Sequence, residues 1–336
     1  MEIVQGSHHV AFQMGDRSCV GEARRHAARL CDQLGFDATL AGRVALLVTE
    51  LGSNLVKHAR HGRLLIASRS SPAREVEVLS VDSGPGIADI SRSMRDGYST
   101  AGTPGTGLGA VKRLSDDFDL YSEPGKGTVA VARVRLKPSL NDRRFRVGVV
   151  ALCAPGENVC GDGWAAATEG DAAAVLMADG LGHGPEALQA AQAAVKSFVA
   201  QPFRPLVPAL EYAHAGLRIT RGAAVAMVLL DGRASAIRSA GAGNVVTRVV
   251  SGTTNRTLLS QHGTLGVQIG KIEERQSEWP QHALIVMHTD GLMQRWEPDV
   301  LRPLLGLDPT LGAAVLMRDY VRGRDDVTVL VLRRKE

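Results

Sequence analysis

The chain has 336 residues with a formal net charge of +4, and its composition is 44% apolar but only 4% aromatic. This length predicts two domains, and the scarcity of aromatic side chains disfavours a protein that stacks single-stranded bases. For the same reason we expect no nucleic acid partner. The sequence lacks a 20-residue apolar window and a secretory signal, so we expect a cytoplasmic protein without a membrane span. It has four cysteines but no CxxC pair, so we expect reduced thiols.

The first 137 residues alternate helical and strand patterns. Apolar residues follow a helical period over 17–34, where Gly35 is suited to end a helix, and Asp37 is suited to cap a second helix that runs to about Arg60. Strands are predicted at 63–70, 75–82, 118–123 and 127–136, and a third helix is predicted at 107–116. A glycine-rich stretch separates the second strand from the third helix, so we expect an α/β layer here.

A polar segment with a proline, "KPSLNDRRF", follows, and it predicts a linker at 138–145. From 146 to 336 strand patterns dominate, interrupted by two helical patterns near 185–200 and 206–219. Strands grouped around a helical pair favour an α+β sandwich over a wound parallel sheet. The fold class is therefore predicted to be α+β, with two sandwich domains at 1–137 and 146–336.

Aspartates lie at the ends of apolar strands in the second domain. They are Asp162 in "CGDGW", Asp179 in "ADGLGHG", Asp290 in "HTDGL" and the adjacent pair Asp325 and Asp326 in "RDDVTVLVL". Asp-Gly pairs are common turn formers, but each of these borders a strongly apolar strand. Carboxylates that converge at strand ends can hold two hard divalent ions, which activate a water and clamp a phosphoryl group.

These motifs, with "AGAGN" and "GTLGV" between them, occur in the order typical of the PPM-type metal-dependent Ser/Thr phosphatases, and residues 145–334 resemble the SpoIIE-like bacterial branch. The resemblance implies an α-β-β-α sandwich that binds two Mn²⁺ or Mg²⁺ ions. It implies that Asp162 and Asp179 bridge or flank the metals, that Gly180 offers its carbonyl and that Asp290 and Asp325 complete the set. Asp326 remains an alternative to Asp325, because only one of two adjacent strand residues faces inward.

Polar residues in the first domain share one face of the second helix. Glu50, Asn54 and Lys57 are spaced by four and three positions, which places them beside the apolar stripe. Downstream, "VDSGPGI" follows a strand, and "GTPGTGLGAVKRL" carries glycines into a helix. Glycine-rich backbone at a helix N-terminus is suited to bind an anion.

Together these segments resemble the Bergerat (GHKL) ATP-binding fold of histidine kinases, gyrase and Hsp90, and within it the anti-sigma and stressosome switch Ser/Thr kinases. The resemblance implies that Glu50 is the catalytic base and that Asn54 holds the Mg²⁺ of bound ATP. The remaining residues implied to bind ATP are Lys57, Asp82, Gly84, Gly86, Gly105, Gly107, Gly109 and Thr128.

The two resemblances together imply a Ser/Thr kinase and an opposing metal-dependent phosphatase on one chain. In the stressosome family these activities sit on separate chains that act on STAS-domain proteins, so a STAS-domain scaffold or anti-sigma antagonist is the expected partner, with a sigma factor or a response regulator as further candidates. Two alternatives stay open: the first domain sequesters a sigma factor or docks a partner without transferring phosphate, or it only senses ATP.

Overall fold

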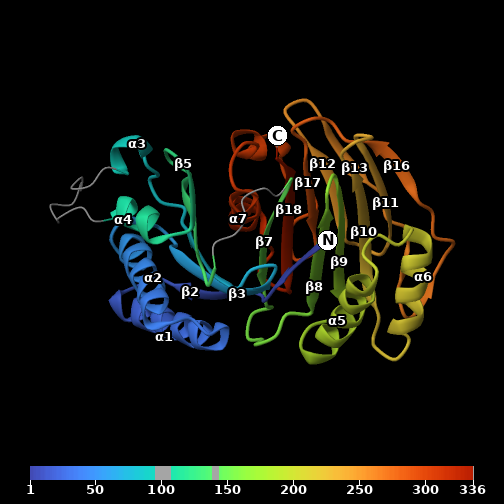
Figure 1. Ribbon diagram of the computed structural model, residues 1–336, viewed down its shortest axis with the longest axis horizontal. Helices are drawn as coiled ribbons and strands as arrows, with labels where there is room; N and C mark the ends of the chain where they lie inside the picture. Colours follow the sequence, from blue (N-terminus) through green and yellow to red (C-terminus); the bar gives the residue numbers. More distant parts are fainter. Residues whose placement is uncertain (95–106, 138–143, 336) are drawn as a thin grey trace. The chain divides into compact units, whose positions relative to one another are not determined.

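The computed structural model describes residues 1–94, 107–137 and 144–335, and it divides into two compact units (Figure 1). The N-terminal unit comprises His9–Asn141, and the C-terminal unit comprises Met1–His8 and Asp142–Glu336. The first eight residues join the C-terminal unit because β1 (Glu2–Gly6) pairs antiparallel with β8 (Asp162–Glu169). The predicted range 1–137 had kept them in the first domain. Most of the predicted linker, 138–143, lies outside the described residues.

The N-terminal unit packs helices on one face of an antiparallel sheet. Its elements are β2 (Val10–Gln13), α1 (Arg17–Leu34), α2 (Ala38–His58), β3 (Arg63–Ser71), β4 (Glu75–Val81), α3 (Ile90–Ser93), α4 (Gly107–Leu114), β5 (Asp117–Glu123) and β6 (Gly127–Arg135). The strand order is β2-β3-β4-β6-β5. Its core joins Leu47 of α2, Val78 of β4 and Val111 of α4.

The helix ends follow the sequence signals. The carboxylate of Asp37 accepts a hydrogen bond from the backbone N–H of Leu40 at 2.8 Å and so caps α2. Gly35 ends α1 with φ +72°, a left-handed conformation that glycine adopts without strain. These two boundaries confirm the predicted stop and cap.

A buried ion-pair cluster lies on β3, β4 and β6 of this unit. Glu77 is fully buried, and its carboxylate contacts Arg133 Nε at 2.6 Å, Arg69 at 3.2 Å and His9 Nε2 at 3.1 Å. Burial alone raises the pKa of Glu77, but the two arginines and His9 outweigh burial and hold that pKa far below its ordinary value. This carboxylate is therefore fully compensated by its neighbours.

The C-terminal unit contains two stacked antiparallel sheets. Besides β1 and β8, its elements are β7 (Phe145–Leu152), β9 (Ala172–Gly180), α5 (Pro185–Ala200), α6 (Leu206–Leu217), β10 (Ala223–Asp231), β11 (Ala236–Ala242), β12 (Val246–Val250), β13 (Asn255–Leu258), β14 (Gly263–Thr264), β15 (Gln268–Ile269), β16 (Arg275–Glu278), β17 (Leu284–His288), a 3-10 helix (Pro298–Leu304), α7 (Pro309–Tyr320) and β18 (Val327–Arg334). Within this unit the sheets run β16-β11-β10-β9-β8-β1 and β13-β12-β17-β18-β7.

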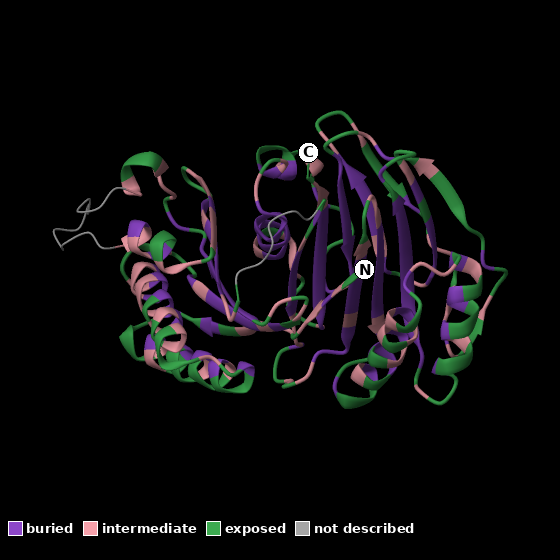
Figure 2. Cartoon of the chain, viewed as in Figure 1, coloured by how far each residue is buried: buried purple, intermediate pink, exposed green. Residues whose placement is uncertain are grey.

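Helices cover both outer faces of this sandwich. The core between the sheets includes Val175, Val228, Ile285 and Leu330, and the strands there are buried (Figure 2). A second core packs α5 and α6 on the first sheet. On the second sheet α7 approaches β7 so closely that a Cβ at Gly148 would lie 2.0 Å from the backbone nitrogen of Thr310. The predicted α-β-β-α sandwich is confirmed.

Two expectations about the chain as a whole can be compared with the described residues. Their helices include none with the length and apolar character needed to cross a membrane. All four cysteines, Cys19, Cys31, Cys153 and Cys160, are free thiols.

Candidate functional sites

Four aspartates of the C-terminal unit lie at the starts or ends of strands. Asp162 begins β8 and pairs directly across the sheet with Asp179, near the end of β9. Asp290 follows β17, and Asp325 precedes β18, which is the neighbour of β17 in the second sheet. The antiparallel pairing of each strand couple thus brings all four carboxylates to one edge of the sandwich, as the motifs predict.

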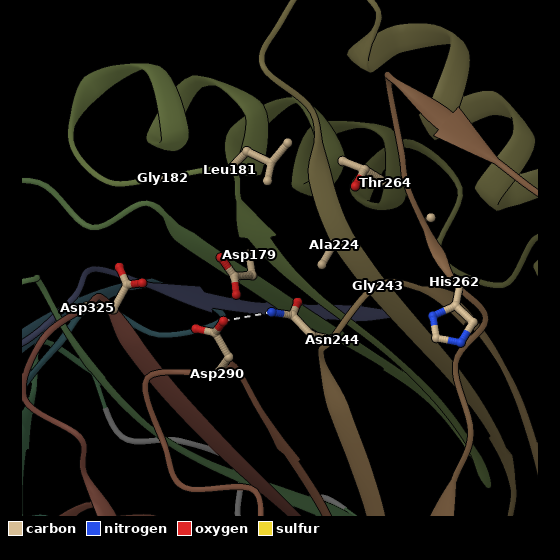
Figure 3. Close-up of a pocket in the computed structure, with 11 residues that line it drawn as sticks. Asp179, Leu181, Gly182, Ala224, Gly243, Asn244, His262, Thr264, Asp290 and Asp325 are labelled. Carbon is tan, nitrogen blue, oxygen red and sulfur yellow. Dashed lines mark hydrogen bonds between the residues drawn. The ribbon is translucent and has the colours of Figure 1, made fainter.

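Three of these carboxylates line a pocket of about 480 Å³ (Figure 3). Asp179, Asp290 and Asp325 face it, and Asn244 Nδ2 donates a hydrogen bond to Asp290 Oδ2 at 2.7 Å. The other lining residues are Leu181, Gly182, Ala224, Gly243, His262, Gly263 and Thr264. Asn244 and Thr264 belong to the motifs "AGAGN" and "GTLGV". The order of these motifs supports the resemblance, but the sequence predicts no role for either residue.

The pocket carboxylates lack the compensation that Glu77 has. Asp162 is buried; its Oδ2 accepts a hydrogen bond from Thr289 Oγ1 at 2.8 Å, whereas its Oδ1 is buried without a hydrogen-bond partner. Burial, and then the charge of Asp179, raises the pKa of Asp162 well above its ordinary value. Burial, followed by the charges of Asp290 and Asp325, raises the pKa of Asp179 to about 7. A divalent cation would relieve this repulsion.

The residues present fit hard divalent ions. Carboxylate oxygens are the ligands that Mg²⁺ and Mn²⁺ prefer, and Asp162 Oδ1 is a buried acceptor without a donor. Within the described ranges, no three His, Cys, Asp or Glu side chains are close enough to form a compact metal cluster.

The adjacent aspartates Asp325 and Asp326 have different surroundings. Asp326 is buried, and its two carboxylate oxygens accept backbone hydrogen bonds from Ala154 at 2.8 Å and from Gly161 at 2.9 Å. Asp325 instead lines the pocket. Of the two alternatives, Asp325 is the one whose carboxylate is available at the pocket.

The glycines of "ADGLGHG" allow a close approach. A Cβ at Gly180 would lie 2.2 Å from the carbonyl oxygen of Ala187, so only glycine fits between β9 and α5. His183, to which the sequence assigned no chemistry, lies in the turn that follows, where its Nδ1 contacts Glu157 Oε1 at 2.6 Å. This contact ties the turn to the segment after β7.

The predicted nucleotide residues of the N-terminal unit occupy two places. On α2, Glu50 and Asn54 are half-buried and Lys57 is exposed. A Cβ at Gly107 would lie 3.7 Å from Asn54 Nδ2, so the Asn54 amide faces the first turn of α4. Backbone N–H groups in the first turn of a helix can bind an anion. Gly109 is buried within α4, and Gly105 lies outside the described residues.

The other place is the turn after β4. Asp82 is buried; its Oδ1 accepts a hydrogen bond from the Gly84 N–H at 2.6 Å, and its own N–H donates to the Thr128 carbonyl at 2.9 Å. Gly86 has φ +73°, and a Cβ there would lie 2.3 Å from the Glu123 carbonyl oxygen. A backbone hydrogen bond therefore joins Asp82, in the turn after β4, to Thr128 on β6, and both are predicted to lie on the adenine side of the site.

A residue that the sequence analysis missed reinforces this connection. Ser122 Oγ lies 2.8 Å from Thr128 Oγ1 and accepts a hydrogen bond from the Ile87 N–H at 2.8 Å. It links the glycine turn to the strand pair β5–β6. A serine within a strand gives no sequence signal of such a role.

Comparison with known proteins places each unit in a family. A family model described as a histidine kinase-like ATPase domain matches residues 16–133, and that of stage II sporulation protein E (SpoIIE) matches residues 169–335. The serine/threonine-protein kinase RsbT of Bacillus subtilis (strain 168) is 36% identical over 124 residues, which make up 34% of this chain and 93% of RsbT.

Solved structures are similar to the C-terminal fold. One from work on the bacterial stressosome, described as a modular system adapted to control secondary messenger signalling, has a TM-score of 0.54 and 29% identity over 57% of this chain and 100% of its own. RsbX in complex with magnesium has a TM-score of 0.51 and 20% identity over 58% of this chain and 98% of RsbX, a likeness in fold. The chain thus belongs, through its histidine kinase-like ATPase domain, to the family of RsbT, and it joins to that domain a SpoIIE phosphatase domain.

Proposed function

We propose that this chain is both a Ser/Thr protein kinase and a metal-dependent Ser/Thr protein phosphatase, and that both activities act on one STAS-domain regulator in the cytoplasm. The observation that carries the proposal is the pocket where Asp179, Asp290 and Asp325 converge, and none of the described residues that line it is a lysine or an arginine. For the kinase half, the support is the likeness to RsbT over 124 residues.

In the phosphatase half, Asp162, Asp179, Asp290 and Asp325, with the Gly180 carbonyl, are proposed to hold two Mn²⁺ or Mg²⁺ ions. Such ions supply Lewis acidity and lower the pKa of a bound water. Asn244 orients the Asp290 carboxylate through its 2.7 Å hydrogen bond, and Thr289 does the same for Asp162. The exposed rim at Leu181 leaves room for a phosphoprotein segment.

In the kinase half, the proposed work is positioning and charge neutralisation. Asn54 holds the Mg²⁺ of ATP, and the first turn of α4, with Gly107 and Gly109, presents backbone N–H groups to the phosphates. Lys57 is a further proposed ATP-binding residue, as is Gly105, which lies outside the described residues. Asp82 accepts from the adenine amino group, with Gly84, Gly86 and Thr128 around the base. Glu50 removes the proton of the substrate hydroxyl.

The test offers full-length protein, ATP and Mg²⁺ to STAS-domain proteins and reads phosphate on them by intact mass. The wild type should keep partner phosphorylation low while ADP accumulates, because each phosphate added is removed. Asp179→Ala should let the phosphorylated partner build up, and adding Glu50→Ala should abolish that signal. If no partner gains a phosphate although the protein binds ATP, the N-terminal unit is a docking or sensing module and the kinase proposal is wrong.

A further inference from the structure

A second cavity, of about 470 Å³, lies at the other end of the C-terminal sandwich. Its walls come from the β10–β11 turn, the β16–β17 turn and the ends of β7 and β18. In β8 and β9 the metal-site pair Asp162 and Asp179 is at one end of the register, and Glu169 pairs with Ala172 at the other. Eight residues of strand separate the two ends by roughly 25 Å. This cavity is therefore distinct from the phosphatase pocket.

The cavity is strongly basic. Arg144, Arg233, Arg334 and Lys335 line it, and none of the described residues that line it is acidic. The nearby carboxylate of Asp171 is shared, since it pairs with Arg144 and also with Arg233 Nε at 3.1 Å. Asp231 also lies beside Arg233, whose backbone N–H donates to its Oδ1 at 2.9 Å. Two carboxylates beside four basic side chains leave an excess of positive charge that attracts anions.

The basic side chains are mounted on a rigid frame. Backbone hydrogen bonds tie the separate segments together: Gly232 donates to Asp171, Trp279 to Ser235 and Lys335 to Arg144. The Trp279 indole is buried, stacks on Phe145 with ring centroids 5.9 Å apart and lies 6.0 Å from the guanidinium of Arg334. Little ordering of the frame is needed when a ligand binds.

Backbone strain is concentrated at the same place. Of the three described non-glycine residues with positive φ, Ser235 at +47° and His282 at +62° both line this cavity. Strained backbone that persists in a fold is often associated with a binding site. Ser235, Gln281 and His282 add polar groups beside the arginines.

We propose that this basic cavity binds the phosphate groups of a small phosphorylated molecule. Arginine guanidinium groups match phosphate oxygens with paired N–H donors, and the four basic side chains outnumber the carboxylates of Asp171 and Asp231 beside them. The volume lies in the range of small-molecule sites and exceeds what a single phosphate fills. A diphosphate, free or as part of a nucleotide, matches both the charge and the size.

The test is calorimetric titration of the full-length chain with pyrophosphate in EDTA, which removes divalent ions from the other two sites. We expect saturable binding of one pyrophosphate per chain, weakened by added salt because the attraction is electrostatic. Arg144→Gln combined with Arg233→Gln should raise Kd by about tenfold or more, since two charge-assisted contacts are lost.

Matched controls separate this site from general attraction to a basic protein. Arg275→Gln removes an exposed, ion-paired arginine elsewhere in the same unit and should leave Kd unchanged. Arg233 is 85% exposed, so Arg233→Gln alone serves if the double variant misfolds. Orthophosphate and ADP as further titrants distinguish a single phosphate from a nucleotide as the natural source, and ADP binding counts only where Arg144→Gln with Arg233→Gln weakens it, because the N-terminal unit is itself proposed to bind ATP. Absence of saturable binding by all three, or an equal loss in Arg275→Gln, overturns the proposal.

Discussion

The two units bury carboxylates on their sheets in opposite electrostatic settings. In the N-terminal unit, Glu77 contacts Arg69, Arg133 and His9, and its pKa is held far below the ordinary value despite burial. In the C-terminal unit, Asp162 and Asp179 face each other across two strands, and burial and like charge raise the pKa of both.

The difference distinguishes a structural charge from a functional one. A buried carboxylate surrounded by arginines has its charge compensated within the fold. Carboxylates that are buried together without cations disfavour their own ionised forms, and they gain from an external ion. Substitutions at either kind of carboxylate should therefore have different effects: loss of activity at the pocket and loss of stability at Glu77.

The largest effect is expected at the pocket. Asp179→Asn removes a charge that the fold itself does not need but that the proposed metal ions do. Manganese-dependent hydrolysis of a phosphoserine peptide should fall by about 10²-fold or more, the scale typical of losing one electrostatic group at a reacting phosphoryl. Steady-state kinetics with Mn²⁺, and with EDTA as the blank, measures the loss.

Stability supplies the control for that variant. Because Asp179 repels Asp162, Asp290 and Asp325, the variant in EDTA should be at least as resistant to urea as the wild type. Trp164, Trp279 and Trp296 all lie in the C-terminal unit, so tryptophan fluorescence reports its unfolding alone. A variant that keeps its activity, or loses it by unfolding, contradicts the assignment.

Substituting Glu77 in the ion-pair cluster of the N-terminal unit should lower the free energy of unfolding of that unit and leave phosphatase activity unchanged. Glu77→Gln removes the carboxylate nearest to Arg69 and Arg133 and leaves them the longer pairs with Glu75, at 3.7 and 3.9 Å. Removing one partner of a buried ion pair typically costs about 3–5 kcal/mol. Hydrogen exchange of the β4 and β6 amides should become faster. Glu123→Gln, which removes a pair of half-exposed side chains with Lys126, is the control and should change little. Unchanged protection of β4 in Glu77→Gln would show that the cluster does not hold the sheet.

Elements with a regular apolar period, or with clear capping and turn residues at their ends, could be predicted from the sequence. Helices α1 and α2 have an apolar stripe and capping residues. Three of the four aspartates are followed by a glycine, and the fourth, Asp325, comes just before an apolar strand. The predicted helices at 185–200 and 206–219 correspond to α5 and α6.

Elements shaped by tertiary packing were missed. Helix α7 has buried residues at every position from Pro309 to Met317, so it shows no amphipathic period. Strand β1 has five residues with one buried, and it is ordered by pairing with β8, in which Glu2 lies opposite Thr168 from the middle of the sequence. The hydrogen bonds of Ser122, Thr289 and Asn244 depend on strand register, which local sequence does not encode.

Acidity should act on the two units with opposite sign. Asp179 has a pKa of about 7 in the fold and an ordinary value of 3.8, so in that interval the folded state binds more protons than the unfolded state. In EDTA the C-terminal unit should therefore lose stability as pH rises from about 4 to about 7. With Mn²⁺ present, binding to ionised carboxylates should reverse this trend.

Glu77 predicts the reverse for the N-terminal unit. Its pKa is lowered from 4.5, so its stabilisation is present above that value and is lost as pH falls below it. Urea denaturation followed by tryptophan fluorescence measures the C-terminal unit, and hydrogen exchange of β4 measures the N-terminal one. Parallel pH trends in the two units, in the absence of metal, would contradict the contrast.

The smallest effect concerns cysteine thiols, where the same contrast recurs. Hydrogen bonding with Cys160, and then with His8, lowers the pKa of Cys153 to about 5, whereas burial raises the pKa of Cys31 to about 11. At neutral pH Cys153 is then a thiolate and Cys31 is not. A low-pKa thiolate is also a weaker nucleophile, with a Brønsted slope of about 0.4–0.5, so at neutral pH the larger thiolate fraction is nearly cancelled and the labelling rate is close to that of an ordinary thiol.

The pH profile of alkylation separates these contributions. Iodoacetamide labelling of Cys153, read by peptide mass, should be nearly independent of pH above about 6, since its thiolate fraction is already complete there. An ordinary thiol gains about tenfold in thiolate per pH unit over the same range. His8→Ala removes one stabilising partner of the thiolate and should restore part of that slope at the acidic end. A labelling rate for Cys153 that climbs as steeply as that of a free thiol would mean that its neighbours do not stabilise the anion.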